Sequence, residues 1–344
     1  MLALLLAAAL VLPPYGDPVV AFSFADPRID ESSGMVVSST SDGVVFTHND
    51  SGDEARFFAV DATGATVTTY DLPDVQARDW EDLARGPDEQ GRSSLWLGDI
   101  GDNSAARDNG ILVHRVAEPV VDDREQVTTE APTSFRLRYP DGPRDAEALM
   151  VHPTTGRLYV VTKPFAGPAQ VYAAPPVLDA DGPNALERVA EVRLRTTGTP
   201  GGPGIGALAQ VLVTAGDIAP DGSRVAIRTY TDVYEWPDTG DDLAQAFQGE
   251  PTVSPLPPTE QGEALAYGAD SRSLLTSSEG EGAPVHRLTA NEPEREPAPA
   301  VDGPRGVQSG DGRSWSVVAA GALVAALAVS ALGRRHRRRS RTHE

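Results

Sequence analysis

A pattern of three short segments occurs five times along the chain and constrains the fold more than any other feature of the sequence. The first segment of each repeat is a polar, mostly acidic cluster that runs into an apolar residue. Its five copies are residues 31–35, 79–83, 145–149, 216–218 and 261–265. Each copy is followed by two further segments that are typical of strands.

The second segment of each repeat is a short apolar run that ends in polar residues. Its copies are residues 44–47, 95–97, 158–161, 224–227 and 274–275. The third segment is rich in β-branched and aromatic residues, and its copies are residues 57–60, 113–116, 171–174, 233–236 and 285–288. Several short strands per repeat, separated by turns, are typical of a β-propeller. We therefore expect an all-β propeller of five or six blades.

One further strand is expected before the first repeat. Residues 19–24 alternate in the manner of a strand. Because this segment lies before the first of the five repeats, we expect it to join the last blade and close the ring. Residues 196–206 are rich in Gly, Thr and Pro and predict a long loop.

Both ends of the chain have the composition of targeting segments. An apolar run over residues 1–12, followed by two prolines, is typical of a secretory signal. We assign residues 1–16 to this signal, 17–290 to the propeller, and 291–314 to a stalk rich in Pro, Glu and Gly.

Residues 315–332 form an uncharged apolar run, and residues 333–344 form a tail rich in arginine. A helix of about 18 residues is about 27 Å long, close to the thickness of a bilayer core. The alternative, a buried core helix, is disfavoured by the arginines that follow. The positive-inside rule predicts a single-pass protein of the cell membrane with a cytoplasmic C-terminus and an extracellular propeller.

The charge and the missing residue types exclude several functions. The chain has 50 acidic and 29 basic residues and a net charge of −21, which disfavours nucleic acid as a partner and suits divalent cations. Solubility alone is the other explanation for the acidity. With no cysteine, there are no disulfides, thiolate nucleophiles or cysteine-ligated zinc. The common hydrolase, zinc-protease and nucleotide-binding motifs do not occur either.

The acidic cluster of each repeat supplies candidate site residues. In a propeller the innermost strands line a central channel, so that polar residues at their ends converge on the axis. Aligning the repeats places four carboxylates at one equivalent position, with two more beside them. The four are Glu81, Glu147, Asp217 and Glu263, and the two are Asp79 and Asp145. Carboxylates gathered in this way bind a cation, pair with a base, or raise one another's pKa.

A second set of candidates follows the second strand of each repeat. The set comprises His48 with Asp50, Asp99 with Asp102 and Asn103, Lys163, Arg228 and Glu279. Residues 98–103 offer oxygen ligands on a loop containing glycine, which suits calcium, although the EF-hand spacing is absent. A turn stabilised by Asp and Asn side chains is the alternative.

The basic candidates and His48 each have two interpretations. Lys163, the only lysine, and Arg228 could hold an anion, or they could form salt bridges with carboxylates such as Glu147 and Glu81. The salt-bridge interpretation is favoured because buried carboxylates generally need such partners. His48 is a candidate base or ligand, and a packing or turn residue is the alternative.

Residues 31–288 resemble exported bacterial β-propellers of the group that includes phytase-like and SdiA-regulated-type proteins. The resemblance is carried by the Glu-Ala-Leu segments that precede strands, at residues 147–159 and 263–274, and by residues 79–82 with 98–103. It implies calcium-assisted hydrolysis of phosphate esters or of lactones at an acidic central funnel. Among these residues it implies calcium ligands in the funnel carboxylates and in Asp99, Asp102 and Asn103. The dense basic surface of a phytase is not visible in the sequence.

The sequence thus supports two functions. The first is a membrane-anchored binding or scaffold module, stabilised by calcium, whose ligand is an unknown small molecule or protein. The alternative is a metal-dependent hydrolase at the same funnel.

Overall fold

The structure is a computed structural model that describes residues 14–291 except 123, 238–239 and 241–242. The proposed signal run, most of the stalk, the apolar run 315–332 and the arginine tail lie outside the described residues. Within the part of the chain that is described, no helix has the length and apolar character needed to cross a membrane.

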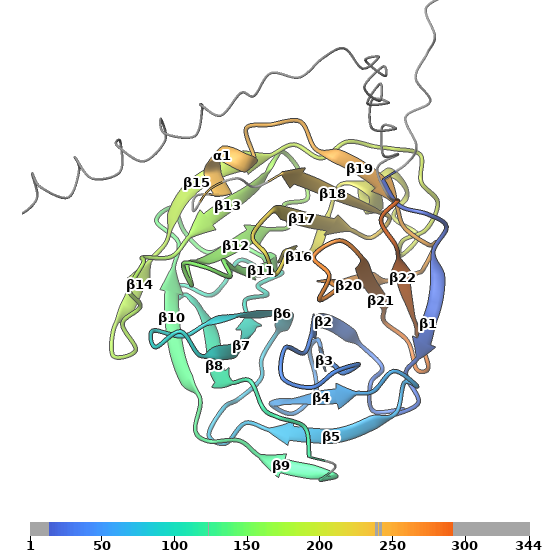
Figure 1. Ribbon diagram of the computed structural model, residues 1–344. Coiled ribbons are helices and arrows are strands. Elements are labelled where there is room, and N and C mark those ends of the chain that lie inside the picture. Colours follow the sequence, from blue (N-terminus) through green and yellow to red (C-terminus); the bar gives the residue numbers. More distant parts are fainter. Residues whose placement is uncertain (1–13, 123, 238–239, 241–242, 292–344) are drawn as a thin grey trace, which may run out of the picture. The chain divides into compact units, whose positions relative to one another are not determined.

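Five antiparallel sheets surround a common axis and form a five-bladed propeller, which confirms the expected fold (Figure 1). The first segment of each repeat lies in an innermost strand, and the second and third segments form the next two strands outward. Blade 1 consists of β2 (Ser32–Val37), β3 (Val45–Asn49), β4 (Arg56–Val60) and β5 (Thr66–Asp71). Blade 2 consists of β6 (Trp80–Pro87), β7 (Ser93–Asp99), β8 (Ile111–Ala117) and β10 (Thr133–Arg138).

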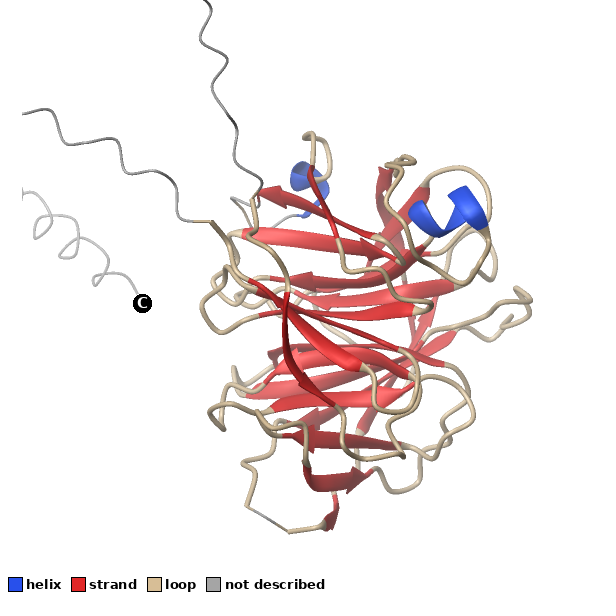
Figure 2. Ribbon diagram, turned by 90° about the vertical axis from the view of Figure 1, so that its right-hand side faces the viewer, coloured by secondary structure: helices blue, strands red, loops and turns tan. Residues whose placement is uncertain are grey.

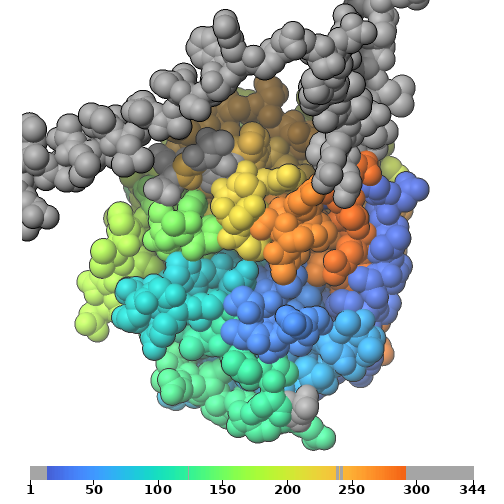
Figure 3. Space-filling model, viewed as in Figure 1, coloured from blue at the N-terminus to red at the C-terminus, as the bar shows by residue number. Residues whose placement is uncertain are grey.

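The remaining blades follow in chain order around the axis, as the colours of Figure 3 show. Blade 3 consists of β11 (Ala146–Val151), β12 (Leu158–Thr162), β13 (Ala169–Ala173) and β15 (Glu187–Val192). Blade 4 consists of β16 (Val213–Ile218), β17 (Arg224–Thr229), β18 (Asp232–Pro237) and β19 (Thr252–Pro255). Blade 5 consists of β20 (Gly262–Tyr267), β21 (Leu274–Ser278), β22 (Pro284–Leu288) and β1 (Val19–Ser23).

Blade 5 closes the ring with strands from both ends of the propeller. The N-terminal strand β1 pairs antiparallel with β22, as the alternation of residues 19–24 predicted. Tyr15 and Gly16, which the predicted signal boundary included, also belong to the fold. Tyr15 forms a bridge with Ala290, and its hydroxyl donates a hydrogen bond of 2.7 Å to Glu235 of blade 4.

Two short strands connect neighbouring blades at the outer rim. β9 (Gln126–Thr128) lies between β8 and β10 of blade 2 in the sequence, but it pairs parallel with β5 of blade 1. β14 (Pro183–Ala185) lies between β13 and β15 of blade 3 in the sequence, but it pairs parallel with β10 of blade 2. Helix is confined to η1 (Gly206–Gln210) and α1 (Leu243–Ala246) among the described residues, as Figure 2 shows. The loop predicted at residues 196–206 leads into η1 and is otherwise without strand or helix.

Apolar side chains fill the space between each pair of neighbouring blades. Five clusters of buried residues occupy the five interfaces between blades, including the one between blades 5 and 1. Aromatic pairs such as Phe57 with Tyr70, whose ring centroids are 4.9 Å apart, stack within them. Because each blade buries both of its faces, the inner strands are held rigidly, and polar groups at their ends have fixed positions.

Every innermost strand contains the same irregularity near its N-terminal end. The pairing with the next strand shifts by one residue after Ser32, Trp80, Ala146, Val213 and Gly262. A β-bulge of this kind turns the side chain of the extra residue away from the regular alternation. The residues that follow the last regular pair are therefore equivalent in the five blades, and they are Ser33, Glu81, Glu147, Thr214 and Glu263.

Candidate metal centre at the propeller axis

The N-terminal ends of the inner strands form a concentration of carboxylates that we call the acidic mouth. Three overlapping groups have ligand oxygens that lie within 4.8 Å of one another. They are Asp50 with Glu263 and Glu279, Asp50 with Asp79 and Glu81, and Glu81 with Asp145 and Glu147. Because Asp50 and Glu81 each belong to two groups, the acidic mouth is one continuous set of seven carboxylates.

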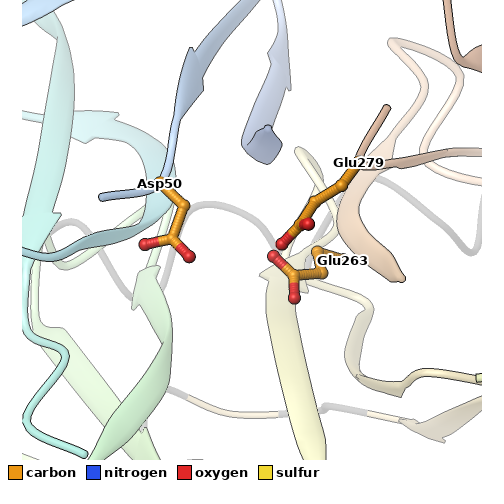
Figure 4. A group of neighbouring side chains, drawn as sticks. All are labelled: Asp50, Glu263 and Glu279. Carbon is orange, nitrogen blue, oxygen red and sulfur yellow. The ribbon is translucent and has the colours of Figure 1, made fainter. Parts of the chain in front are cut away.

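The acidic mouth combines two rows of residues. Glu81, Glu147 and Glu263 come from the bulges of the inner strands. Asp50 and Glu279 come directly after the second strands of blades 1 and 5. Figure 4 shows that the carboxyl groups of Glu263 and Glu279 lie close together and that Asp50 faces them.

A shared hydrogen bond explains why the second row is in register. The backbone N–H of Asp50 donates to the Glu31 carbonyl at 3.0 Å, and that of Glu279 donates to the Gln261 carbonyl at 2.9 Å. Lys163 makes the equivalent bond to Asp145 in blade 3, at 3.1 Å. These three side chains therefore start from equivalent backbone positions.

Several oxygens of the acidic mouth are buried without a hydrogen-bond partner. Glu263 is 3% exposed, and its Oε2 has no partner among the described residues. The same holds for Asp50 Oδ1 and Asp145 Oδ2, so that each of the three groups contains at least one such oxygen. A buried carboxylate oxygen without a partner is costly, because it has lost its water without gaining a donor. A cation in the group of Asp50, Glu263 and Glu279 would satisfy the first two of these oxygens, and one in the group of Glu81, Asp145 and Glu147 would satisfy the third.

The pKa values in the acidic mouth reflect this crowding. Burial, followed by repulsion from Glu147 and Asp79, raises the pKa of Asp50 to about 8. Burial and the charge of Glu147 raise the pKa of both Glu81 and Glu263 well above the ordinary value. The hydrogen bond between Glu81 and Glu147 raises the pKa of Glu81 and opposes the rise at Glu147, so Glu81 is the partner that holds the proton.

Lys163 is the cation that contacts the acidic mouth within the described residues. Its Nζ lies 2.9 Å from Glu147 Oε1 and 5.0 Å from the centre of the Tyr230 ring. Burial lowers the pKa of Lys163, but the charge of Glu147 together with Tyr230 and Glu263 outweighs burial, and the pKa lies above its usual range. This geometry corresponds to the salt-bridge interpretation of Lys163. One ammonium group leaves most of the seven carboxylates uncompensated.

Asp217 lies elsewhere, and this corrects the predicted alignment of the fourth repeat. The bulge residue of blade 4 is Thr214, three residues before Asp217. Asp217 is at the other end of β16, where its oxygens accept the backbone N–H groups of Ile218 at 2.8 Å and Tyr267 at 2.7 Å. The alignment failed because blade 4 has no acidic residue at the equivalent position, and the nearest one in the sequence was taken instead.

Arg228 and His48 are also displaced from the acidic mouth. Each lies two positions before the second-row position of its own repeat. Both are buried, since Arg228 is 1% exposed and His48 is 0% exposed. Arg228 Nη1 donates to the carbonyls of Ala264 and, at 2.7 Å, of Ser277, which joins blade 4 to blade 5. His48 Nδ1 donates to the Asn49 carbonyl at 2.7 Å, and its ring packs edge-on against Trp80. Burial lowers the pKa of His48, so this ring is a neutral packing group.

The loop of Asp99, Asp102 and Asn103 does not gather its side chains into one group. Asp99 forms a buried salt bridge with Arg107 at 2.7 Å. The oxygens of Asp102 accept the backbone N–H groups of Ala106 at 2.9 Å and Arg107 at 2.8 Å, while Asn103 is exposed. This arrangement matches the turn that was the alternative for this loop.

The composition of the acidic mouth fits a hard divalent cation. Calcium takes six to eight oxygen ligands, mostly from carboxylates, in irregular geometry, whereas magnesium requires a near-ideal octahedron. Gly101 allows the close approach of two of these ligands. A Cβ atom at Gly101 would lie 2.0 Å from Glu81 Oε1 and 2.6 Å from Asp79 Oδ2.

The sequence placed Asp50 and Glu279 in a second set of candidates and did not group them with the carboxylates of the inner strands. Their signal was their position directly after the second strand of the repeat, one residue beyond β3 and β21. Acidic character alone could not distinguish Asp50 and Glu279 from Asp99. Asp99 is also acidic and lies at the end of a second strand, β7, but it forms a salt bridge with Arg107.

Comparison with known proteins yields similarities of fold only. No family model matches the chain, and no curated protein matches it. Among solved structures, the nidogen/laminin complex has a TM-score of 0.40 at 14% identity and covers 73% of each chain. The RRP9 WD40 repeats have a TM-score of 0.40 at 12% identity, with 80% of this chain and 98% of that chain covered. A gluconolactonase from Xanthomonas campestris has a TM-score of 0.39 at 13% identity, with 81% and 99% covered.

Proposed function

We propose that this protein is a cation-binding propeller of the cell surface, in which a calcium ion bound at the acidic mouth stabilises a binding or scaffold module. The observation that carries the proposal is the set of buried carboxylate oxygens without hydrogen-bond partners in three adjoining groups. Asp50 and Glu263, which share one of these groups, come from blades 1 and 5, so an ion held there would join two blades that lie at opposite ends of the propeller sequence.

The experiment is a calcium titration of the purified full chain after treatment with chelator, followed by isothermal calorimetry and thermal unfolding. Because the ion binds the folded state in preference to the unfolded chain, Tm should rise with the logarithm of free calcium above the dissociation constant. Glu81→Gln combined with Glu263→Gln should remove the response. Glu130→Gln changes the same charge at an exposed position of the outer rim and is the matched control.

The proposal fails if the chelated wild type shows no calorimetric response and no change in Tm with calcium. The loop of residues 99–103 is tested in the same assay with Asp102→Ala. This variant should lower stability without changing the calcium response, because its carboxylate supports a turn. Loss of the response in this variant alone would move the ion to the loop.

Metal-dependent hydrolysis at the same mouth is the second candidate. It is supported by the pKa of Asp50, which burial and neighbouring carboxylates raise to about 8, so that this carboxyl can exchange a proton near neutral pH. Phosphate esters and lactones should be screened with and without chelator. Turnover that requires the metal and disappears in Asp50→Asn, with folding intact, would establish this candidate. Calcium binding without turnover would favour the binding module.

Attachment to the membrane through residues 315–332 completes the proposal. An apolar run of this length followed by arginines supports a single span with a cytoplasmic C-terminus. In intact cells, added protease should digest the propeller and leave a tag placed after residue 344 protected. Digestion of that tag would show that this orientation is wrong.

A further inference from the structure

A second cavity, distinct from the acidic mouth, opens on the outer part of blade 2. It has a volume of about 710 Å³ and lies between β8, β10 and the segments at residues 74–78 and 180–183. A neighbouring cavity of about 370 Å³ shares Arg78, Asp99, Leu112 and Arg136 with it. Together we call these the blade 2 cavity, and Figure 1 shows its strands β8, β10 and β14 on the outer side of that blade.

Three arginines without a carboxylate partner line the blade 2 cavity. Arg136 and Arg138 are two residues apart on β10 and therefore point to the same side of the strand. Their contacts are weak bonds of 3.4 and 3.5 Å to the Asn109 carbonyl. The third is Arg78, for which no ion pair within 4.0 Å is found among the described residues, although its charge partly offsets the rise that burial causes in the pKa of the neighbouring Asp79.

Some exposed arginines elsewhere pair with nearby carboxylates, as in Arg92 with Asp88 at 2.7 Å and Arg144 with Asp141 at 2.6 Å. The three arginines of the blade 2 cavity form no such ion pair among the described residues, so their guanidinium groups keep donors for a ligand. Arginine presents a planar set of donors that matches a phosphate or carboxylate group.

Four carboxylates line the blade 2 cavity beside these arginines, and they are Asp74, Asp99, Asp108 and Asp181. Asp99 reaches the cavity, but it is neutralised by Arg107 in a buried salt bridge of 2.7 Å. His114 Nδ1 lies 2.7 Å from Ser134 Oγ, and the two groups add polar atoms without negative charge. At the rim, the exposed Asp74 and Asp181 supply carboxylates that can accept hydrogen bonds from hydroxyl groups.

We propose that the blade 2 cavity binds a sugar-sized ligand that carries a phosphate or carboxylate group. Arg78, Arg136 and Arg138 hold the anionic group, and Asp74 and Asp181 accept hydrogen bonds from its hydroxyl groups. The rim carboxylates disfavour a densely charged polyanion, and the volume suits a small molecule. The cavity uses no residue of the acidic mouth, so this proposal stands independently of the cation site.

The test is calorimetric titration of the full chain in the presence of chelator, so that a cation at the mouth plays no part. The probes are glucose 6-phosphate, glucuronate, glucose and inorganic phosphate. We expect glucose 6-phosphate or glucuronate to bind, and the one that binds more tightly identifies the anionic group. Added salt should weaken this binding, because guanidinium groups at a surface are screened.

Variants then assign the binding to the arginines. Arg136→Gln combined with Arg138→Gln should weaken binding by at least about tenfold. Both side chains are exposed, so the fold should survive this change. The matched control is Arg272→Gln, at an exposed arginine of blade 5 whose side chain has no ion pair among the described residues. It should leave the affinity unchanged.

Three outcomes would overturn the proposal. The first is that neither anionic sugar binds at millimolar concentration. The second is that glucose or inorganic phosphate binds as tightly as the anionic sugars, which would remove the requirement for both groups on one ligand. The third is that Arg272→Gln weakens binding as much as the double variant does.

Discussion

The two ends of the propeller axis treat carboxylates in opposite ways. At the acidic mouth, oxygens of Asp50, Asp145 and Glu263 are buried without a hydrogen-bond partner. At the other end, Asp217 accepts two backbone N–H groups. Asp82, one residue beyond Glu81 along β6, accepts three, from Leu83 at 2.8 Å, Leu149 at 2.9 Å and Gly216 at 3.2 Å. Burial alone therefore does not indicate a ligand site. A buried carboxylate whose oxygens are already bonded is structural, and one whose oxygens are not bonded is a candidate ligand.

The largest effect is expected at Asp82, whose side chain links the inner strands of blades 2, 3 and 4. Asp82→Ala would leave three buried N–H groups without an acceptor, and we expect a loss of at least about 3 kcal/mol in the free energy of unfolding. Denaturation with urea measures it, and Asp82→Asn, which keeps one acceptor oxygen, should lose less. A loss below about 1 kcal/mol would contradict the structural role.

A glycine at the mouth should control the affinity for calcium. In Gly101→Ala, the new methyl group must displace the carboxyl groups of Glu81 and Asp79, and we expect calcium binding to weaken by about tenfold in calorimetry. Gly240→Ala is the control, because a Cβ atom there meets nothing within 4 Å. Unchanged affinity in Gly101→Ala would place the ion away from Glu81.

Removing a carboxylate at the acidic mouth should stabilise the chelated protein, whereas removing the carboxylate of Asp82 should destabilise it. In the presence of chelator at pH 8, Glu263→Gln relieves repulsion from Glu147 and Glu279, and we expect stability to rise on the order of 1 kcal/mol. The same variant should lose the stabilisation by calcium. Destabilisation of the chelated protein by Glu263→Gln would mean that this carboxylate is structural as well.

The smallest effect is a dependence on pH that follows from Asp50. Its pKa is about 8 in the folded protein, above the ordinary value of 3.8, so the folded state holds the proton more strongly. Its contribution to stability is complete below pH 3.8 and is lost as pH rises through about 8. In the presence of chelator, Tm should fall by a few degrees between neutral and alkaline pH. Added calcium should raise Tm by more at alkaline pH than at neutral pH. Asp50→Asn should flatten this profile.

The repeated strands and the closing strand could be predicted because they depend on local patterns. Alternation and β-branched residues placed β1, β4 and β8 correctly, and the acidic segments placed Glu81, Glu147 and Glu263 at equivalent positions. These features need no knowledge of contacts between blades. The propeller itself then follows from repetition.

The parts that failed depend on register and on distant partners. A bulge shifts the pairing by one residue without leaving a mark in composition, so nothing local showed that Thr214 occupies the position assigned to Asp217. The depth of Arg228 depends on the carbonyl groups of blade 5, which lie far along the chain. Asp50 and Asp99 look alike in the sequence, and only Arg107 distinguishes them.

The closure of blade 5 also has a mechanical consequence. The chain enters and leaves the propeller at one point, where Asn291 N–H donates to the Pro14 carbonyl at 2.9 Å and Gly16 N–H donates to Thr289 at 3.0 Å. Tension applied after residue 291 therefore acts first on β22 and its neighbours β1 and β21. Blade 5 also carries Glu263 and Glu279, so we expect a pulling force to dismantle the acidic mouth before blades 2, 3 and 4 unfold. A bound ion would then raise the force at which this blade yields.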